Sequence, residues 1–154
     1  MRKTRVLLLV SLVLGPLSGF PQASDLGSTL AVVREFLDAF NAHDAAAMSA
    51  MVADDVQWLS VRGSEISIEL EGRAALVAAM GEYFTSCPTC RSEIKGQMSS
   101  SERVSVVEVA SWVGSKGPRS QQSIAVYEFS DSLIQRIYYF PEEAVLSRID
   151  PATP

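Results

Sequence analysis

A chain of 154 residues is long enough for one domain with a hydrophobic core, and a composition of 47% hydrophobic and 20% charged residues excludes wholesale disorder and fibrous classes. Its 13 basic and 18 acidic residues give a net charge of −5. Nucleic-acid binding depends on clustered cations, so this acidic chain, which lacks a Lys/Arg stripe, makes nucleic acid a poor candidate ligand.

The first 23 residues have the plan of a secretory signal peptide. Three basic residues precede an apolar run over residues 6–14, and a Gly-Pro pair ends that run. The run is shorter than the ~20 residues that a spanning helix needs, so we expect a cleaved leader and no stable membrane anchor. Cleavage is expected after Ala23, with Gly19 as the rival position. Residues 24–154 would then form a single domain of net charge −8, with 10 basic and 18 acidic residues, exported to the periplasm or secreted.

The first predicted element of this domain is an amphipathic helix that follows Ser28, a residue type favoured at helix N-caps. Its apolar residues recur at helical spacing, and they are Leu30, Val33, Leu37 and Phe40. A break follows over residues 41–43, and Asp44 is then placed to cap a second helix that runs through Met51.

Three polar residues in this region invite a catalytic interpretation. His43 is the only histidine, but no Cys or carboxylate accompanies it at ligand spacing, so we interpret it as structural and expect no metal site. Asp54 and Asp55 are expected to end the second helix. Neighbouring residues on an extended chain point to opposite sides, so these two carboxylates cannot converge on one bond, and we assign them to capping and solubility.

A β-hairpin and a third helix come next. Residues 56–61 alternate as in a strand, a turn follows, and residues 66–70 alternate again. The sequence that starts with Gly72 and Arg73 has a helical apolar face, and this helix is expected to end before Pro88.

The two cysteines, Cys87 and Cys90, form a C-x-x-C pair after the third helix. Such a pair can be a disulfide, a redox dithiol or half of a metal site. Zinc would need further ligands, and a redox motif would be expected to open a helix, whereas this one precedes strands. We therefore expect a small structural disulfide at this corner.

The remainder of the chain is rich in strands joined by turns, which predicts an antiparallel meander. One strand is apolar on both faces, as expected if helices cover one side and a partner or long loop covers the other. The four predicted strands are residues 93–98, 104–113, 121–129 and 133–140.

This order of elements, together with several short motifs, resembles the nuclear transport factor 2-like (NTF2-like) superfamily, in particular its SnoaL-like and ketosteroid-isomerase-like branch. The motifs are N-A-H-D at 41–44, A-D-D-V-x-W at 53–58, G-R at 72–73 and a closing Y-E-F to I-Y-Y-F hairpin. The resemblance implies an α+β fold: an NTF2-like cone of three N-terminal helices packed on a curved, mainly antiparallel sheet.

The resemblance also implies an apolar cavity and, for the isomerases, three catalytic groups: a carboxylate base, a tyrosine and a protonated aspartate. Matching the motifs places Ser60 at the base position, Phe36 at the tyrosine position and Ala125 at the aspartate position. None of these side chains can fill the catalytic role at its position. Phe and Ala donate no hydrogen bond, and an unaided serine is not a base near neutral pH. We expect no cofactor.

Alternation along the strands predicts which residues face the cavity. If Trp112 points inward, so does Glu108, the one catalytic candidate, whose pKa would then be raised. The alternative places Glu108 on the outer face and Trp112 in core packing. The expected ligand-pocket residues are Phe36, Trp58, Ser60, Tyr83, Trp112, Tyr127 and Tyr139.

Three functions follow as hypotheses. The first, which leans away from an enzyme, is an exported domain that binds a small hydrophobic molecule in an apolar pocket. The second is a cofactor-independent isomerase, hydratase or cyclase that uses Glu108 or a pocket tyrosine. The third is an interaction module without a ligand, in which an outer sheet face of Val126, Ile134, Arg136 and Tyr138 forms a homodimer.

Overall fold

The computed structural model describes residues 23–141, so the expected signal peptide, apart from Ala23, lies outside the described residues. The described chain folds as α+β. Its helices are α1 (Ala23–Asn41), α2 (Ala45–Ala50) and α3 (Arg73–Ser86). Its strands are β1 (Val52–Arg62), β2 (Glu65–Glu71), β3 (Arg91–Ser99), β4 (Arg103–Gly114), β5 (Gly117–Ser130) and β6 (Leu133–Pro141).

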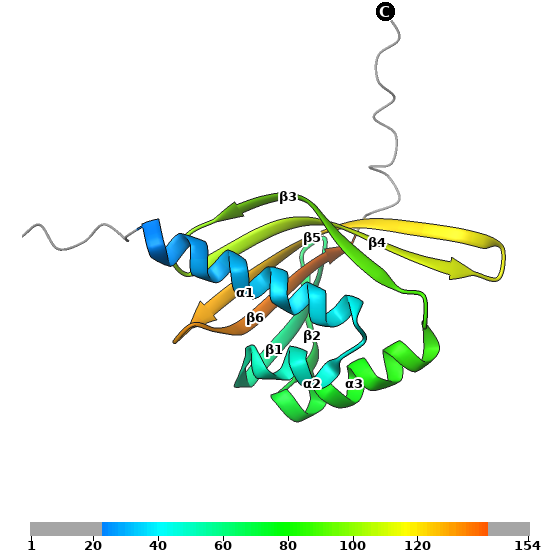
Figure 1. Cartoon of the computed structure of the whole chain (residues 1–154), viewed down its shortest axis with the longest axis horizontal. Coiled ribbons are helices and arrows are strands. Elements are labelled where there is room, and N and C mark those ends of the chain that lie inside the picture. Colours follow the sequence, from blue (N-terminus) through cyan, green and yellow to red (C-terminus); the bar gives the residue numbers. More distant parts are fainter. Residues whose placement is uncertain (1–22, 142–154) are drawn as a thin grey trace, which may run out of the picture.

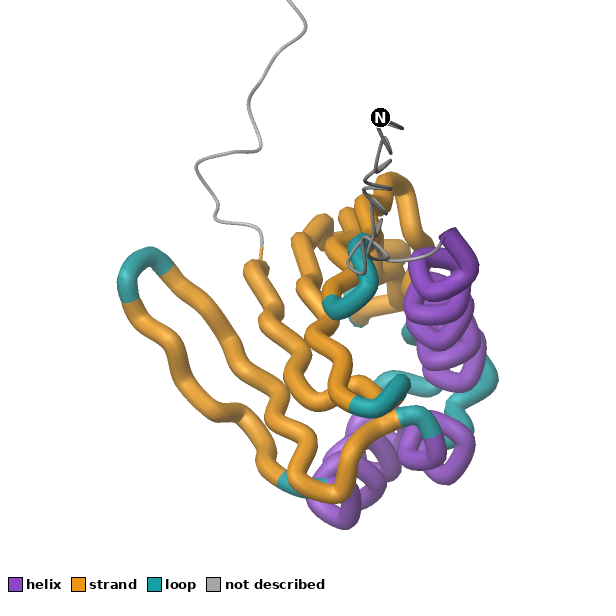
Figure 2. Tube along the Cα trace, turned by 90° about the vertical axis from the view of Figure 1, so that its left-hand side faces the viewer, coloured by secondary structure: helices purple, strands orange, loops and turns teal. Residues whose placement is uncertain are grey.

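The six strands form one curved, mixed sheet in the order β2-β1-β6-β5-β4-β3. Neighbouring strands are antiparallel except for β1 and β6, which are parallel. All three helices lie on one side of the sheet (Figures 1 and 2). The expectation of three N-terminal helices is only roughly matched, because α3 follows the β1–β2 hairpin. From there the chain crosses to the opposite edge, and the meander returns to place β6 beside β1.

The boundaries around α2 correct one expectation and confirm another. Asp44 caps this helix as expected, because its Oδ1 accepts a hydrogen bond from the Ala47 amide at 2.8 Å. Asp54 and Asp55 do not end the helix but lie within β1. The helix is shorter than expected because Val52 already pairs with Ile134 of β6 in the sheet. Asp54 instead forms an ion pair with Arg73 at 3.1 Å.

The corner between α3 and β3 is fixed by the expected disulfide, which joins Cys87 and Cys90. His43 packs against the same corner, with its ring stacked on Phe84 at a centroid distance of 4.6 Å. Its Nε2 lies 3.1 Å from the Cys90 carbonyl oxygen and 3.0 Å from Nη1 of Arg91. These contacts agree with a structural interpretation of His43.

The core lies between the helices and the concave face of the sheet. Its fully buried side chains include Val33 and Phe36 of α1, Leu76 of α3 and Ile137 of β6, and each stabilises the fold by about 1.5–3 kcal/mol. Ile134 also belongs to this core with 0% of its surface exposed, so its expected place on the outer face is wrong. The reason is a shift of register in the β5–β6 pairing, which alternation in the sequence does not reveal.

The turn into α3 depends on a glycine, and we predict the cost of replacing it. Gly72 has φ +92° and ψ 148°, a conformation close to glycine-only backbone, so Gly72→Ala should lower the free energy of unfolding by about 1–3 kcal/mol. Gly81, within the exposed part of α3, has no atom near an added Cβ, so Gly81→Ala should raise stability by about 0.5–1 kcal/mol. Denaturant unfolding of both variants checks this, and a stabilising Gly72→Ala would contradict it.

Candidate functional site

The strand register brings most of the expected pocket residues onto one face of the sheet. Across β1 and β6, Trp58 pairs with Ile137 and Ser60 with Tyr139. Across β5 and β6, Tyr127 also pairs with Ile137. Directly paired residues point to the same side of a sheet, so these side chains share the concave face that the core covers.

Strand β4 continues this face with the acidic candidate. Val104 pairs with Tyr127, and Glu108 pairs with Ser123, so Glu108 points to the same side as Tyr127. Trp112 lies on that side too, because it is an even number of residues from Glu108 along an extended strand. The alternative in which Glu108 faces outward is therefore wrong.

Glu108 is buried, with 8% of its surface exposed, and each of its carboxyl oxygens accepts a hydrogen bond. The hydroxyl of Tyr127 donates to Oε1 at 2.7 Å, and the hydroxyl of Ser92 donates to Oε2 at 3.2 Å. The Tyr127 ring is itself buried and packs edge-on against Phe36 at a centroid distance of 6.1 Å. Sequence reasoning thus located Glu108 and Tyr127 but missed Ser92.

Burial is the largest influence on the pKa values of Glu108 and Tyr127. It raises the pKa of the Glu108 carboxyl above its ordinary value, because the loss of water outweighs the two hydrogen bonds that favour the carboxylate. Burial also raises the pKa of the Tyr127 phenol well above its ordinary value, and the neighbouring Glu108 adds to this rise. Tyr127 therefore stays a hydrogen-bond donor throughout the neutral range.

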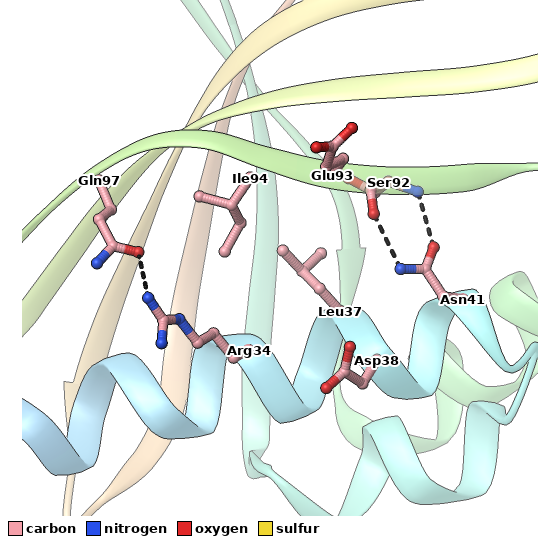
Figure 3. Close-up of a pocket in the computed structure, with 8 residues that line it drawn as sticks. All are labelled: Arg34, Leu37, Asp38, Asn41, Ser92, Glu93, Ile94 and Gln97. Atoms are coloured by element: carbon pink, nitrogen blue, oxygen red, sulfur yellow. Dashed lines mark hydrogen bonds between the residues drawn. The ribbon is translucent and has the colours of Figure 1, made fainter.

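Ser92 is held in place by the last residue of α1. The side-chain amide of Asn41 donates to the Ser92 carbonyl at 2.9 Å, and the Ser92 amide donates to Asn41 Oδ1 at 2.8 Å (Figure 3). The helix thus fixes the β3 residue whose hydroxyl holds Glu108. In the sequence, Asn41 belongs to the break after the first helix and to the N-A-H-D motif, and neither feature predicts this contact.

A groove of about 360 Å³ runs between α1 and β3 beside this cluster (Figure 3). The Asn41–Ser92 bonds cross it at one end, and at the other Arg34 donates to Gln97 Oε1 at 3.0 Å. Ser92 is shared between the groove and the Glu108 cluster. The lining residues are Arg34, Leu37, Asp38, Asn41, Ser92, Glu93, Ile94 and Gln97.

The remaining pocket candidates lie around this cluster rather than within it. Tyr83 is 39% exposed, and its hydroxyl donates to the Cys90 sulfur at 3.3 Å. Burial, followed by the proximity of Tyr139, raises the Tyr83 pKa. Ser60 is buried on β1, which β6 and β5 separate from the strand of Glu108, and it lines a separate hollow of about 410 Å³ beside the β1–β2 hairpin. Ser60 and Glu108 therefore do not form one catalytic pair.

Within residues 23–141, no group of three or more His, Cys, Asp or Glu side chains is placed to hold a metal ion. No helix in this part of the chain is long and apolar enough to cross a membrane.

Comparison with known proteins agrees with this architecture. The SnoaL-like domain family matches residues 33–137. No curated protein matches the sequence significantly.

Solved structures share the fold at low sequence identity. An uncharacterized cystatin-fold protein from Novosphingobium aromaticivorans is 22% identical with a TM-score of 0.65, over 72% of this chain and 96% of that one. A putative ketosteroid isomerase from Kribbella flavida is 22% identical with a TM-score of 0.64, and the match covers 78% of this chain and 82% of that one. A putative polyketide cyclase from Xanthomonas campestris is 19% identical with a TM-score of 0.56, and the match covers 75% of this chain and 91% of that one.

The raised pKa of Glu108 predicts how stability changes with pH. Below the ordinary glutamate pKa of 4.5, the carboxyl is protonated in both states and folding carries no ionisation penalty. As pH rises, the unfolded state ionises first, so stability is lost until Glu108 ionises in the folded state as well. Glu108→Gln removes this loss, so the variant should gain stability relative to the wild type as pH rises from 4.5 to the raised pKa of Glu108 in the folded state.

Denaturant unfolding at several pH values measures this difference. Glu82→Gln, an exposed carboxylate on α3, is the control and should change stability by less than about 0.5 kcal/mol. A constant difference between wild type and Glu108→Gln across the pH range would contradict the prediction.

Proposed function

This chain belongs to the SnoaL-like domain family, and we propose that it is an exported protein that binds a small, mostly apolar molecule on the concave face of its sheet. One polar group of the ligand would meet Glu108. The family includes proteins with catalytic and with binding roles, so the fold alone does not decide between them.

The observation that carries the proposal is the buried carboxyl of Glu108. A carboxyl costs free energy to bury, and a fold that needed only a core would be served better by an apolar side chain at this position. Within residues 23–141, the hydrogen-bond partners of the Glu108 carboxyl are two hydroxyls rather than cations. A buried acid in apolar surroundings with a shifted pKa is a feature of functional sites.

Aromatic side chains on the same face supply the apolar surface. Trp58, Trp112 and Tyr139 are half-buried, so part of the surface of each residue remains accessible. Such rings contribute large contact areas and favourable stacking geometry to a planar ligand. The proposed site is therefore an aromatic surface with a single acidic group.

The same geometry argues against ketosteroid isomerisation by the familiar mechanism. Phe36 and Ala125 are each 1% exposed in the core, and neither can donate a hydrogen bond to an oxyanion. Matching the motifs places Ser60 at the position of the isomerase base. The isomerase and cyclase among the solved neighbours therefore support the fold and not the reaction.

Export rests on the amino-terminal sequence and receives support from the disulfide. Residues 1–23 have the charge and hydropathy plan of a leader. The Cys87–Cys90 disulfide is the state that an oxidising compartment favours. A periplasmic or secreted location fits both.

Acid–base catalysis by Glu108 is the second candidate, and its raised pKa favours it. In this case the protein would be a cofactor-independent isomerase, hydratase or cyclase. The Glu108 carboxylate would take a proton from the carbon next to a ligand carbonyl, leaving an enolate, and would return the proton to another atom.

Exchange of the methyl protons of 2-acetylnaphthalene for deuterium in D₂O, followed by NMR, tests this candidate. Catalysis by Glu108 predicts exchange above the buffer rate with wild-type protein and at the buffer rate with Glu108→Gln. Exchange that is equally fast with both proteins would assign the chemistry to another group.

A homodimer through the outer sheet face remains a third possibility. Ile124 and Phe140, which are paired across β5 and β6, are 50% and 36% exposed on that face. Tyr138 lies nearby and donates to Glu128 at 3.3 Å. Sedimentation velocity at micromolar concentration decides the matter, because a monomer excludes this interface.

Ligand binding itself is tested with 2-naphthol as the probe. Saturation at 100 times Kd should stabilise the full chain by about 2.7 kcal/mol in thermal unfolding. Tyr139→Leu should weaken binding by about fivefold, because the lost aromatic contact contributes about 0.5–1.5 kcal/mol. Isothermal titration measures both affinities.

The matched control is Tyr138→Leu, the adjacent residue on the opposite face of β6. Its affinity for 2-naphthol should stay within about twofold of the wild-type value, a change of less than about 0.5 kcal/mol. Equal losses in the two variants, or no stabilisation of the wild type, would count against binding on the concave face.

A further inference from the structure

Ser123 of β5 carries a buried hydroxyl that the described part of the protein leaves without a hydrogen-bond partner. Its side chain is on the concave face, and only 4% of the residue's surface is exposed. Buried polar groups in native proteins nearly always have a partner, so an unpaired hydroxyl requires an explanation. The simplest is a partner that does not belong to the protein chain.

The position of Ser123 indicates which partner this is. It lies directly opposite Glu108 in the β4–β5 pairing, and side chains in such pairs start about 4.5–5.5 Å apart at Cβ. The two oxygens of Glu108 already accept hydrogen bonds from Tyr127 and Ser92, and Ser123 contributes to neither. A carboxyl oxygen has room for a second bond, so both Ser123 and Glu108 have hydrogen-bonding capacity left on the same face.

The residues beside this point, toward the β4–β5 turn, are only partly buried. Ala110 pairs with Gln121 next to the Glu108–Ser123 pair, and Trp112 follows on the same face. All three are half-buried, and the β4–β5 hairpin extends past the end of α3 (Figure 1). An aromatic ligand lying on Trp112 would present its polar end to Ser123 and Glu108.

We infer that Ser123 is a second polar contact of the ligand site, and that the ligand is an uncharged aromatic molecule whose hydroxyl lies between Ser123 and Glu108. This inference rests on the proposed binding function. The ligand hydroxyl accepts a hydrogen bond from Ser123 and donates one to Glu108. A carboxylate ligand would place a second acid beside Glu108, and an ammonium offers no acceptor to the Ser123 hydroxyl.

A pair of probes that differ in one group tests the inference. 2-Naphthol carries the hydroxyl, and 2-methylnaphthalene has a methyl group in its place. Wild-type protein should bind 2-naphthol at least about tenfold more tightly, because a site built for a hydroxyl rejects the analogue that lacks it. Ser123→Ala should weaken 2-naphthol binding by about fivefold or more and leave 2-methylnaphthalene within twofold.

The melting temperature of the ligand-free variant supplies a second readout. Removal of an unpaired buried hydroxyl should leave Tm unchanged or raise it. A clear fall in Tm would instead mean that Ser123 binds a structural water, and would overturn the inference. Ser120→Ala is the control, because Ser120 is exposed on the opposite face of the same strand and should alter neither readout.

The outcomes separate the two claims. If wild type and Ser123→Ala bind 2-naphthol with affinities within twofold, the role of Ser123 is wrong while the binding function stands. If the wild type binds neither probe, the proposed function fails, and the ligand class inferred here fails with it.

Discussion

Two hydroxyls hold the carboxyl of Glu108 in apolar surroundings, and these hydrogen bonds link four elements. Glu108 belongs to β4, Tyr127 to β5 and Ser92 to β3, and Asn41 ties Ser92 to the end of α1. Because an unpaired buried carboxyl is costly, each of these elements must keep its place for the others to remain satisfied. The polar cluster therefore sets the relative position of α1 and the three strands more narrowly than apolar packing would.

The sheet order places this cluster on β3, β4 and β5, at the end of the sheet that β3 closes. The parallel pairing of β1 with β6 brings the aromatic side chains of the hairpin, such as Trp58, beside those of the closing strands, such as Tyr139. The chain crosses from β2 through α3 to the opposite edge of the sheet, and this crossover lets β6 return beside β1. Without it, the face that carries Glu108 would have aromatic side chains from β3–β6 alone. The topology thus combines, on one face, residues from both halves of the chain.

Strand alternation in the sequence was sufficient to predict the concave face of β4 and β5, because the side-chain period of two holds along these strands, whose pairing has no register shift. It correctly placed Glu108 and Tyr127 together. It failed for Ile134, where a register shift moves the side chain into the core, and for Asp54, where β1 begins earlier than the pattern indicates. Ser92 and Ser123 were missed since their roles depend on which residues pair across strands, and single serines carry no motif.

The Asn41 side chain has a further consequence for the edge of the sheet. β3 is an edge strand, and exposed amide and carbonyl groups on such a strand can pair with a strand of another molecule. Asn41 occupies both backbone groups of Ser92, and Arg34 reaches across to Gln97 farther along the same edge. A foreign strand would have to displace these side chains before it could add to β3. The contact that positions the acid therefore also blocks strand addition at Ser92.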